Sequence, residues 1–237
     1  MEERNETQTI HFLRTTKVPE NMIQAFASLN REILKPAWIE FKDVGRLINE
    51  MSGAVLVIDS IDSREAKQIR YMCKRKSKSQ PMPKEVIPLK IFTAYALVSI
   101  NPREIKQLPT CKYPISSICM KNCHITVSGL GPKRSKEMMR KLMSMGASFR
   151  RGLHKRTSYV IADDWTSSKV SYIRRCRGNA SCVIKPEWVE RCWEMRENLK
   201  DAKQLIDQFK LPIFTGMSIC VTGVSFFFIY KIFFFLN

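Results

Sequence analysis

A short apolar pattern that ends in a hydroxyl residue followed by glycine occurs twice in this sequence. Residues 126–130 read Thr-Val-Ser-Gly-Leu, and residues 220–224 read Cys-Val-Thr-Gly-Val. A strand that stops at such a pair presents a hydroxyl group and an unobstructed backbone N–H at the edge of a sheet. Because both groups can donate to the same anion, Ser128 with Gly129 forms a candidate anion site, and the second copy repeats it.

The chain is strongly basic, and the excess is concentrated in its second part. Its 237 residues include 40 Lys and Arg against 22 Asp and Glu, a net charge of +18. Residues 1–110 carry a net charge of +5 and residues 111–237 carry +13. This balance favours nucleic acid, anionic lipid or a phosphorylated protein as partner, the alternative being a basic solvated surface with no specific ligand.

The eight cysteines form no Cys-x-x-Cys pair, and no signal peptide is evident. They are therefore interpreted as reduced intracellular thiols, several of them in the core. Cys119, Cys123 and His124 resemble metal ligands, but no distant Cys/His pair at zinc spacing accompanies them. Neither a zinc site nor a cofactor is expected.

Residues 10–100 are expected to form a first domain after a disordered N-terminus at residues 1–9. The elements expected in it are a helix at 21–34, a buried strand at 54–58, a helix at 64–75 capped by Ser63, a loop from the basic run 74–78 through Pro81 and Pro83, an edge strand at 86–89, and a helix or strand at 90–99. The basic run could also be a nuclear localisation signal. Prolines between residues 101 and 114 predict an extended linker.

Residues 115–208 are expected to form a second domain with the order β-α-β-β-α-β-α. The elements expected are a strand at 124–127, a helix at 133–145 with Pro132 in its first turn and Gly146 at its end, strands at 147–149 and 159–162, a helix from a cap at Thr166 or Ser167 to 177, a strand at 182–184 and a helix from 186. This order predicts an α/β fold with a small central parallel four-stranded sheet flanked by helices.

Five landmarks in this second region resemble, in order, those of the BRCT family. They are the Ser128-Gly129 turn, a small-residue turn at 145–147, a third strand at 159–162, Lys169 at the start of the second helix, and the last helix at 186–192 with Trp188. The resemblance implies that Trp188 is buried against the sheet.

The chain up to Ser225 further resembles the N-terminal region of the topoisomerase II-binding scaffold family, which acts in DNA replication and the damage checkpoint. That family begins with a degenerate BRCT-like domain lacking a phosphate site, followed by two more BRCT domains. Residues 10–100 resemble the degenerate domain, and residues 209–225 resemble the entry into the third. The resemblance implies a nuclear, non-enzymatic scaffold.

The same resemblance implies a phosphate-binding role for particular residues. Ser128 would supply the hydroxyl, Gly129 the backbone N–H and Lys169, 41 residues after Ser128, the ammonium, with Arg134 as a further candidate. The implied partners are replication and checkpoint proteins that contain phosphoserine or phosphothreonine, whose phosphates carry about −1.5 to −2 charges. Without the resemblance, the Ser-Gly pair would be interpreted as a tight turn and nothing more, and the lysine as a solvated helix residue.

Two other functions stay open at this point. The basic surface could bind DNA directly, with Arg174, Arg175 and Arg177 as a patch; the alternative, which we favour, is a solvated helix end stabilised by the helix dipole. The chain could be a BRCT-bearing fragment of an enzyme, although no Lys-x-Asp-Gly motif, Walker loop or catalytic triad pattern is present.

The last residues depart from the family pattern. Residues 226–237 contain six of the thirteen phenylalanines and are interrupted by Lys231. The stretch is too short to span a bilayer, which needs about 20 apolar residues, so no membrane anchor is expected. We interpret it as non-homologous sequence that truncates a third domain, which would leave Thr222 and Gly223 without a lysine partner.

Overall fold

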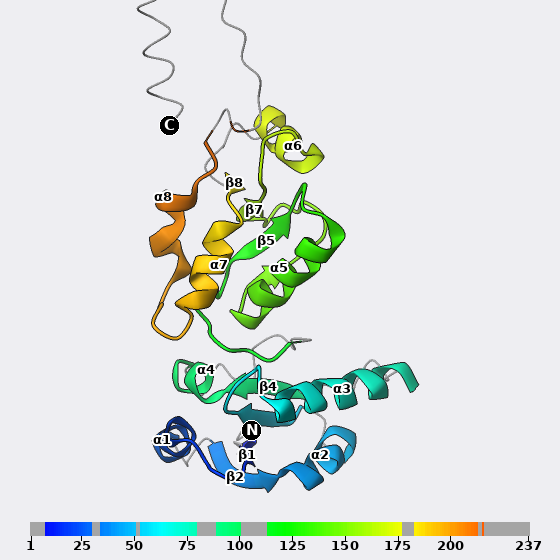
Figure 1. The fold of residues 1–237 in the computed structure, drawn as a ribbon, viewed down its shortest axis with the longest axis vertical. Helices are drawn as coiled ribbons and strands as arrows, with labels where there is room; N and C mark the ends of the chain where they lie inside the picture. Colours follow the sequence, from blue (N-terminus) through cyan, green and yellow to red (C-terminus); the bar gives the residue numbers. More distant parts are fainter. Residues whose placement is uncertain are drawn as a thin grey trace, which may run out of the picture. The chain divides into compact units, whose positions relative to one another are not determined.

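The computed structural model describes residues 8–29, 34–50, 53–79, 89–100, 113–176, 183–212 and Thr215. They form two compact units (Figure 1). The first contains residues up to 121 together with 143–146 and 195–200, and the second contains residues 122–142, 147–194 and those from 201 onward. Each unit is built around its own parallel four-stranded sheet, so the predicted α/β fold class is confirmed.

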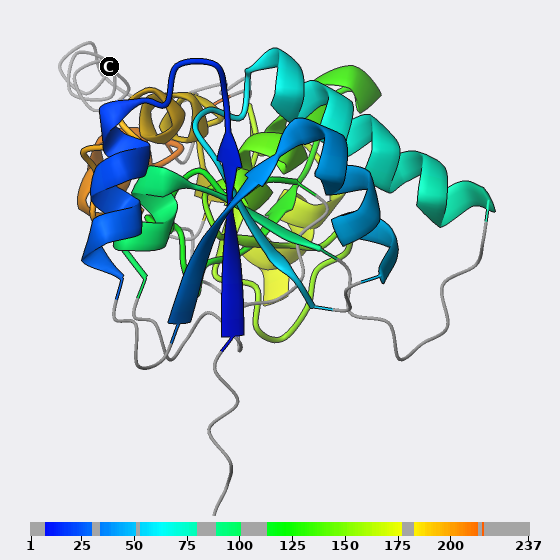
Figure 2. The ribbon, with the colours of Figure 1, turned by 90° about the horizontal axis from the view of Figure 1, so that it is seen from below.

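The first unit has the strand order β2-β1-β3-β4, with all neighbours parallel. Its elements are β1 (Gln8–Arg14), α1 (Glu20–Ser28), β2 (Leu34–Glu40), the 3-10 helix η1 (Phe41–Asp43), α2 (Val44–Glu50), β3 (Val55–Ile58), α3 (Arg64–Ser79), β4 (Lys90–Thr93) and α4 (Ala94–Val98). Helices α1 and α4 lie on one face of the sheet, and α2 and α3 lie on the other (Figure 2). Strand β3 is buried along its whole length, as its apolar run predicted.

An aromatic cluster covers the outer part of this sheet. Phe12 in β1 is fully buried, and its ring contacts Phe26 of α1 at 5.2 Å between centroids. Phe26 stacks on Trp38 of β2 at 4.9 Å, and Trp38 keeps 37% of its surface exposed. This cluster joins α1 to the two strands that the sequence pattern did not reveal.

Three predictions for the first unit were wrong in detail. Gln8 and Thr9 belong to β1, where they pair with Leu34 and Lys35, and not to a disordered terminus. The helix predicted to reach residue 34 ends at Ser28, because Leu34 begins β2. Helix α3 continues to Ser79 through the basic run interpreted as a loop, since Lys and Arg are good helix formers.

The second unit repeats this strand order as β6-β5-β7-β8, again all parallel. Its elements are β5 (His124–Val127), α5 (Pro132–Ser144), β6 (Ser148–Phe149), β7 (Tyr159–Ile161), α6 (Ser168–Cys176), β8 (Val183–Ile184), α7 (Glu187–Glu194), the 3-10 helix η4 (Ala202–Leu205) and α8 (Ile206–Phe209). The predicted order β-α-β-β-α-β-α is confirmed, with boundaries that shift by one or two residues. Gly146 follows α5 with φ of 84°, as expected for a residue that ends a helix.

Two buried tryptophans hold the second unit together. Trp188 in α7 is fully buried, contacts the ring of Tyr159 and donates from Nε1 to the Ala202 carbonyl at 3.0 Å, so the prediction for Trp188 is confirmed. Trp165 packs with Val170 of α6 and donates from Nε1 to the Pro212 carbonyl at 2.5 Å. Lys141 of α5 pairs with Glu190 of α7 and thereby joins these two helices.

The backbone pairing moves two predicted domain boundaries. Ile115 donates to Ile91 and accepts from Thr93, both at 2.9 Å, so it extends the first sheet and does not open the second domain. At the other boundary, Leu211 donates to Val183 at 3.0 Å and Lys210 pairs with Ile184, so these residues complete the second unit. The expected edge strand at 86–89, almost all of the linker, the second hydroxyl–glycine copy and the aromatic tail lie outside the described residues, apart from Leu89, Tyr113 and Pro114.

Candidate anion-binding site

In the second sheet the connections from the two central strands, β5 and β7, run in opposite directions. Strand β5 leads through α5 to β6 on one side, and β7 leads through α6 to β8 on the other. Right-handed crossovers in opposite directions place α5 and α6 on opposite faces of the sheet. The loops after β5 and β7 therefore diverge, and ligands of open α/β sheets bind at such a point.

Ser128 and Ser167 lie in these two loops and contact each other. Ser128 follows β5, and its backbone N–H donates to the Ile161 carbonyl of β7 at 2.9 Å. Its hydroxyl lies 2.7 Å from the hydroxyl of Ser167, which precedes α6, and either can be the donor. Ser128 is only 5% exposed. Two hydroxyls from opposite loops are thus held at one point.

Gly129 adopts a conformation that other residues rarely tolerate. Its φ is 74°, in the left-handed region. A Cβ at this position would lie 3.2 Å from the Cβ of Ser167. The turn therefore favours glycine, and a side chain here would also require Ser167 to move by a few tenths of an ångström.

Lys169 lies in the first turn of α6 and donates to three neutral acceptors. These are the carbonyl of Arg151 at 2.5 Å, the carbonyl of Val127 at 2.6 Å and the hydroxyl of Thr126 at 3.3 Å. Burial lowers the pKa of Lys169, because the charged ammonium loses water contact. An anion at this point would restore the pKa and could replace the longest of the three bonds.

Arg134, unlike Lys169, forms an ion pair with a carboxylate. Its guanidinium pairs with the Asp163 carboxylate at 2.6 Å, and both side chains are about half exposed. Neighbouring Asp164 accepts from the backbone and the hydroxyl of Thr166, which lowers the pKa of the Asp164 carboxyl. Arg134 thus lies beside the loop after β7 but is neutralised there, and its predicted phosphate contact stays a prediction.

The arrangement combines the donors that a compact anion needs. The Ser128 and Ser167 hydroxyls, the Gly129 backbone, the Lys169 ammonium and the N-terminus of α6 belong to adjacent loops at one sheet edge. Sequence reasoning named Ser167 only as a helix cap and gave no role to the Arg151 carbonyl. The one feature of the sequence that could have indicated a role for Ser167 in the site is its position two residues before Lys169.

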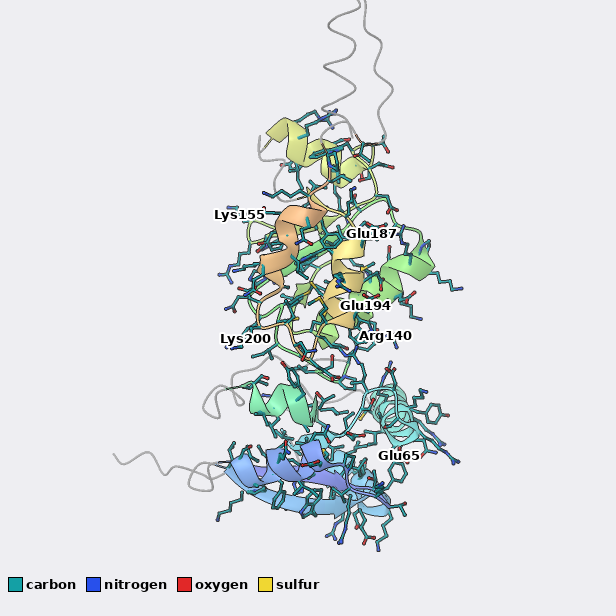
Figure 3. The ribbon with its side chains drawn as sticks, turned by 60° about the vertical axis from the view of Figure 1, so that its left-hand side comes forward. Glu65, Arg140, Lys155, Glu187, Glu194 and Lys200 are labelled. Carbon is teal, nitrogen blue, oxygen red and sulfur yellow. The ribbon has the colours of Figure 1, made fainter. Side chains whose placement is uncertain are left out.

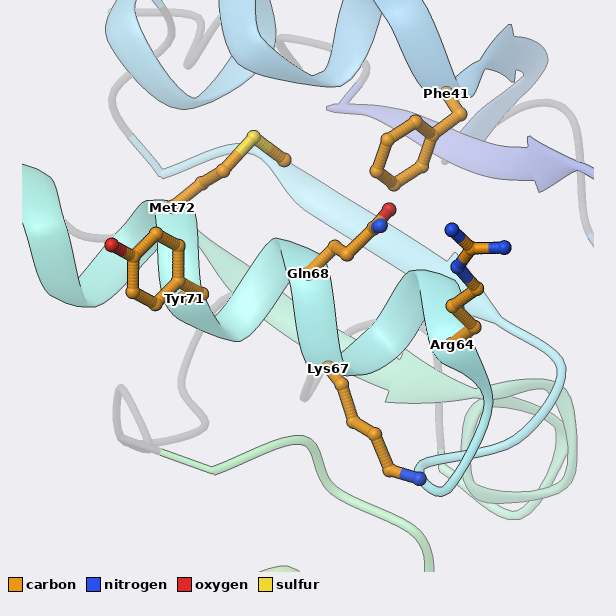
Figure 4. A pocket seen from close by; sticks show the side chains of 6 residues that line it. All are labelled: Phe41, Arg64, Lys67, Gln68, Tyr71 and Met72. Atoms are coloured by element: carbon orange, nitrogen blue, oxygen red, sulfur yellow. The ribbon is translucent and has the colours of Figure 1, made fainter.

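A hollow lies on the first unit, along α3. Phe41, Arg64, Lys67, Gln68, Tyr71 and Met72 line it. Figure 4 shows that Gln68 and Arg64 extend from α3 toward Phe41, whereas Lys67 points the other way. The lining lacks a hydroxyl–glycine turn, so it does not repeat the arrangement at Ser128.

Three further findings concern the described residues. No cluster of three or more His, Cys, Asp or Glu side chains there is placed to hold a metal ion. Cys119 and Cys123 are buried. None of the helices in this part of the chain is long and apolar enough to cross a membrane.

Comparison with known proteins finds a family match whose residues lie mostly in the second unit. Residues 116–193 match the model of the BRCA1 C Terminus (BRCT) domain family. Among solved structures, Rad4 BRCT1,2 in complex with a Crb2 phosphopeptide is 12% identical, with a TM-score of 0.32 over 86% of this chain and 97% of that one. Yeast Rtt107 is 14% identical, with a TM-score of 0.42 over 90% of this chain and 46% of that one. The BRCT domain of human REV1 is 27% identical, with a TM-score of 0.27 over 33% of this chain and 77% of that one.

Proposed function

We propose that the BRCT domain of this chain binds phosphoserine- or phosphothreonine-containing segments of partner proteins. In this proposal the protein is a non-enzymatic nuclear scaffold for DNA replication and damage-checkpoint signalling. The binding proposal is supported by the hydroxyl pair of Ser128 and Ser167 and by the bond from Lys169 to the carbonyl of Val127, the residue before Ser128. The cellular setting rests on the family resemblance.

A phosphomonoester fits this donor set in charge and in shape. It carries about −1.5 to −2 charges and three terminal oxygens. In the proposed complex the Ser128–Ser167 bond opens so that both hydroxyls donate outward, while Lys169 exchanges Thr126 for a phosphate oxygen. Each charge-assisted bond contributes about 1.5–3 kcal/mol. Three such bonds with modest peptide contacts support micromolar affinity, about −8 kcal/mol.

The Rad4 structure is by its own description a phosphopeptide complex. At a TM-score of 0.32 that likeness adds no weight, so the proposal depends on the geometry around Ser128.

A matched pair of variants tests the proposal. A phosphothreonine peptide and its unphosphorylated twin are titrated by fluorescence anisotropy against the full chain, Lys169→Gln and Lys67→Gln. The first variant removes the ammonium at the site, and the second removes an ammonium from α3 of the first unit. We expect Lys169→Gln to weaken phosphopeptide binding about 10–100-fold, the effect of one charge-assisted bond, and Lys67→Gln to leave it unchanged.

A short DNA duplex titrated against the same proteins tests the DNA-binding alternative, which the net charge of +18 favours. Equal binding of both peptides, with tight duplex DNA binding that falls steeply with salt, would replace the proposed function by DNA binding.

A further inference from the structure

The loop between β6 and β7 carries an unusual concentration of positive charge. Residues 150–156, here called the basic loop, include Arg150, Arg151, Lys155 and Arg156 and no acidic residue. All four cations are exposed, and Lys155 lies at the periphery of the second unit (Figure 3). Among the described residues, none of the four forms an ion pair with an acidic side chain. Their mutual repulsion is therefore not relieved within this part of the chain.

The basic loop is fixed to the anion site by hydrogen bonds. The Arg151 carbonyl accepts from the Lys169 ammonium at 2.5 Å and from the Thr126 hydroxyl at 3.3 Å. The Arg150 N–H donates to the Ile125 carbonyl of β5 at 3.0 Å. The loop backbone is thus joined to the lysine of the site and to the strand that presents Ser128.

The far half of the loop is also ordered. His154 accepts at Nδ1 from the Arg156 N–H at 3.1 Å, and its own N–H donates to the Thr157 hydroxyl at 2.9 Å. Leu153 packs against the core that contains Trp165 and Val160. The cations are therefore carried on a preorganised turn, which lowers the entropic cost of using them in binding.

The two sides of the site differ in charge. On the β7 side, Asp163 is paired with Arg134, and Asp164 accepts from Thr166. On the β6 side, Arg150 and Arg151 directly follow the strand and have no such counter-charge among the described residues. The unbalanced positive charge lies on one side of the site only.

We infer that the basic loop recognises acidic residues that flank the phosphorylated residue, so the ligand is a phosphopeptide with a cluster of Asp or Glu beside its phosphate. This inference rests on the proposed function and names the class of peptide that the same site selects. Carboxylates reach exposed guanidinium and ammonium groups across a few residues of extended peptide.

The donor set of the site favours such a peptide over duplex DNA. The hydroxyls of Ser128 and Ser167 lie 2.7 Å apart and can donate to neighbouring oxygens of one group. A terminal phosphomonoester on a side chain offers three free oxygens to these donors. A backbone phosphodiester offers two. Duplex DNA is therefore an outcome of the test below and not the proposed ligand.

The test compares charge-matched variants of the full chain. Arg150→Gln/Arg151→Gln neutralises the start of the basic loop and leaves the Arg151 carbonyl in place. Arg140→Gln/Lys203→Gln removes the same charge from α5 and η4, with Arg140 in the last part of α5 (Figure 3). Arg150→Lys/Arg151→Lys restores the charge. Each protein is titrated with one phosphothreonine peptide flanked by Asp and Glu, the same peptide flanked by Ser and Gln, the unphosphorylated acidic peptide, and a short DNA duplex.

We expect the unmodified chain to bind the acidic phosphopeptide about 5–10-fold more tightly than the neutral one, the scale of a few exposed ion pairs. The loop variant should lose this preference, and the charge-matched control and the lysine variant should keep it. Thermal unfolding of each variant establishes that the fold is retained.

The outcomes separate the two proposals. Equal binding of the acidic and neutral phosphopeptides, or a preference that survives in the loop variant, overturns the role of the basic loop and leaves the phosphate site intact. Equal binding of phosphorylated and unphosphorylated acidic peptides overturns the proposed function itself. If the loop variant loses affinity for duplex DNA but keeps the peptide preference, the loop is a DNA contact and the inference is wrong.

Discussion

The two units have the same strand order, yet the described residues at their carboxyl edges are engaged differently. In the second unit, Ser128 follows β5 and its hydroxyl reaches across to Ser167. In the first unit, Thr15 follows β1, but its hydroxyl donates to the Lys17 carbonyl two residues on, at 2.9 Å. The Thr15 hydroxyl, which occupies the position after β1 that Ser128 occupies after β5, therefore donates within its own turn.

The loop after β7 in the second unit and the corresponding loop after β3 in the first unit lead into helices that begin with different charges. Lys169 is the second residue of α6, whereas the second residue of α3 is Glu65. The loop after β3 adds Asp59, which accepts from Asn21 at 3.2 Å, and Asp62. Glu65 directly follows Arg64 there, so carboxylates offset the positive charge that an anion would meet. The comparison teaches that one sheet topology carries a site only where the edge residues supply it.

The largest contrast concerns the tryptophans of the two units. Trp188→Ala removes a fully buried ring and its bond to Ala202, so we expect the second unit to lose about 3–5 kcal/mol of unfolding free energy. Trp38→Ala removes a ring that is 37% exposed, and the first unit should lose about 1–2 kcal/mol. Urea unfolding with amide NMR assigns each loss to its unit, and equal losses would contradict the contrast.

The next largest effect is expected on phosphopeptide binding, from removal of the hydroxyl that follows the central strand of each unit. Ser128→Ala should weaken phosphopeptide binding about tenfold, because one hydroxyl donor to a charged group is lost. Thr15→Ala in the first unit should leave the dissociation constant unchanged, since that hydroxyl serves its own turn. Calorimetric titration measures both values. Comparable losses in the two variants would mean that the first unit takes part in binding.

Two glycine-to-alanine substitutions, one in each unit, should change stability in opposite directions. Gly129→Ala places a Cβ 3.2 Å from Ser167 at φ of 74°, and we expect a cost of about 1–2 kcal/mol in stability together with weaker phosphopeptide binding. Gly45→Ala in α2 meets no atom within 4 Å and should stabilise the first unit by about 0.5–1 kcal/mol. Thermal melts distinguish the two, and stabilisation by Gly129→Ala would refute the argument from close approach.

The smallest effect expected is a pH dependence confined to the first unit. Burial lowers the pKa of His11 in β1 below its ordinary value. The unfolded chain therefore binds the proton more readily, so stability is complete above about pH 6.5 and falls as the pH drops from there toward the lowered pKa. Hydrogen exchange of β1 amides between pH 7.5 and 5.5 measures this loss. His11→Gln should abolish it, and an unchanged profile in that variant would assign the loss to another group.

Local patterns predicted the second unit well and the first unit poorly, for a physical reason. The strand at 124–127, Pro132 at the start of α5 and Gly146 at its end are encoded by neighbouring residues, and the structure confirms them. In the first unit, β2 exists because Leu34 pairs with Gln8 and Trp38 stacks on Phe26. Pairing at that separation leaves no local pattern, and the apolar spacing at 21–34 favoured a longer helix.

The sequence by itself determined the fold class, the burial of Trp188 and the candidacy of Ser128, Gly129 and Lys169. Only the tertiary structure decided how these side chains are engaged. The bond from Ser128 to Ser167, the carbonyl acceptors of Lys169 and the pairing of Arg134 with Asp163 each join segments far apart in the chain. A parallel sheet brings its carboxyl-end loops to one edge, and that convergence is a property of strand order, which no single segment of sequence encodes.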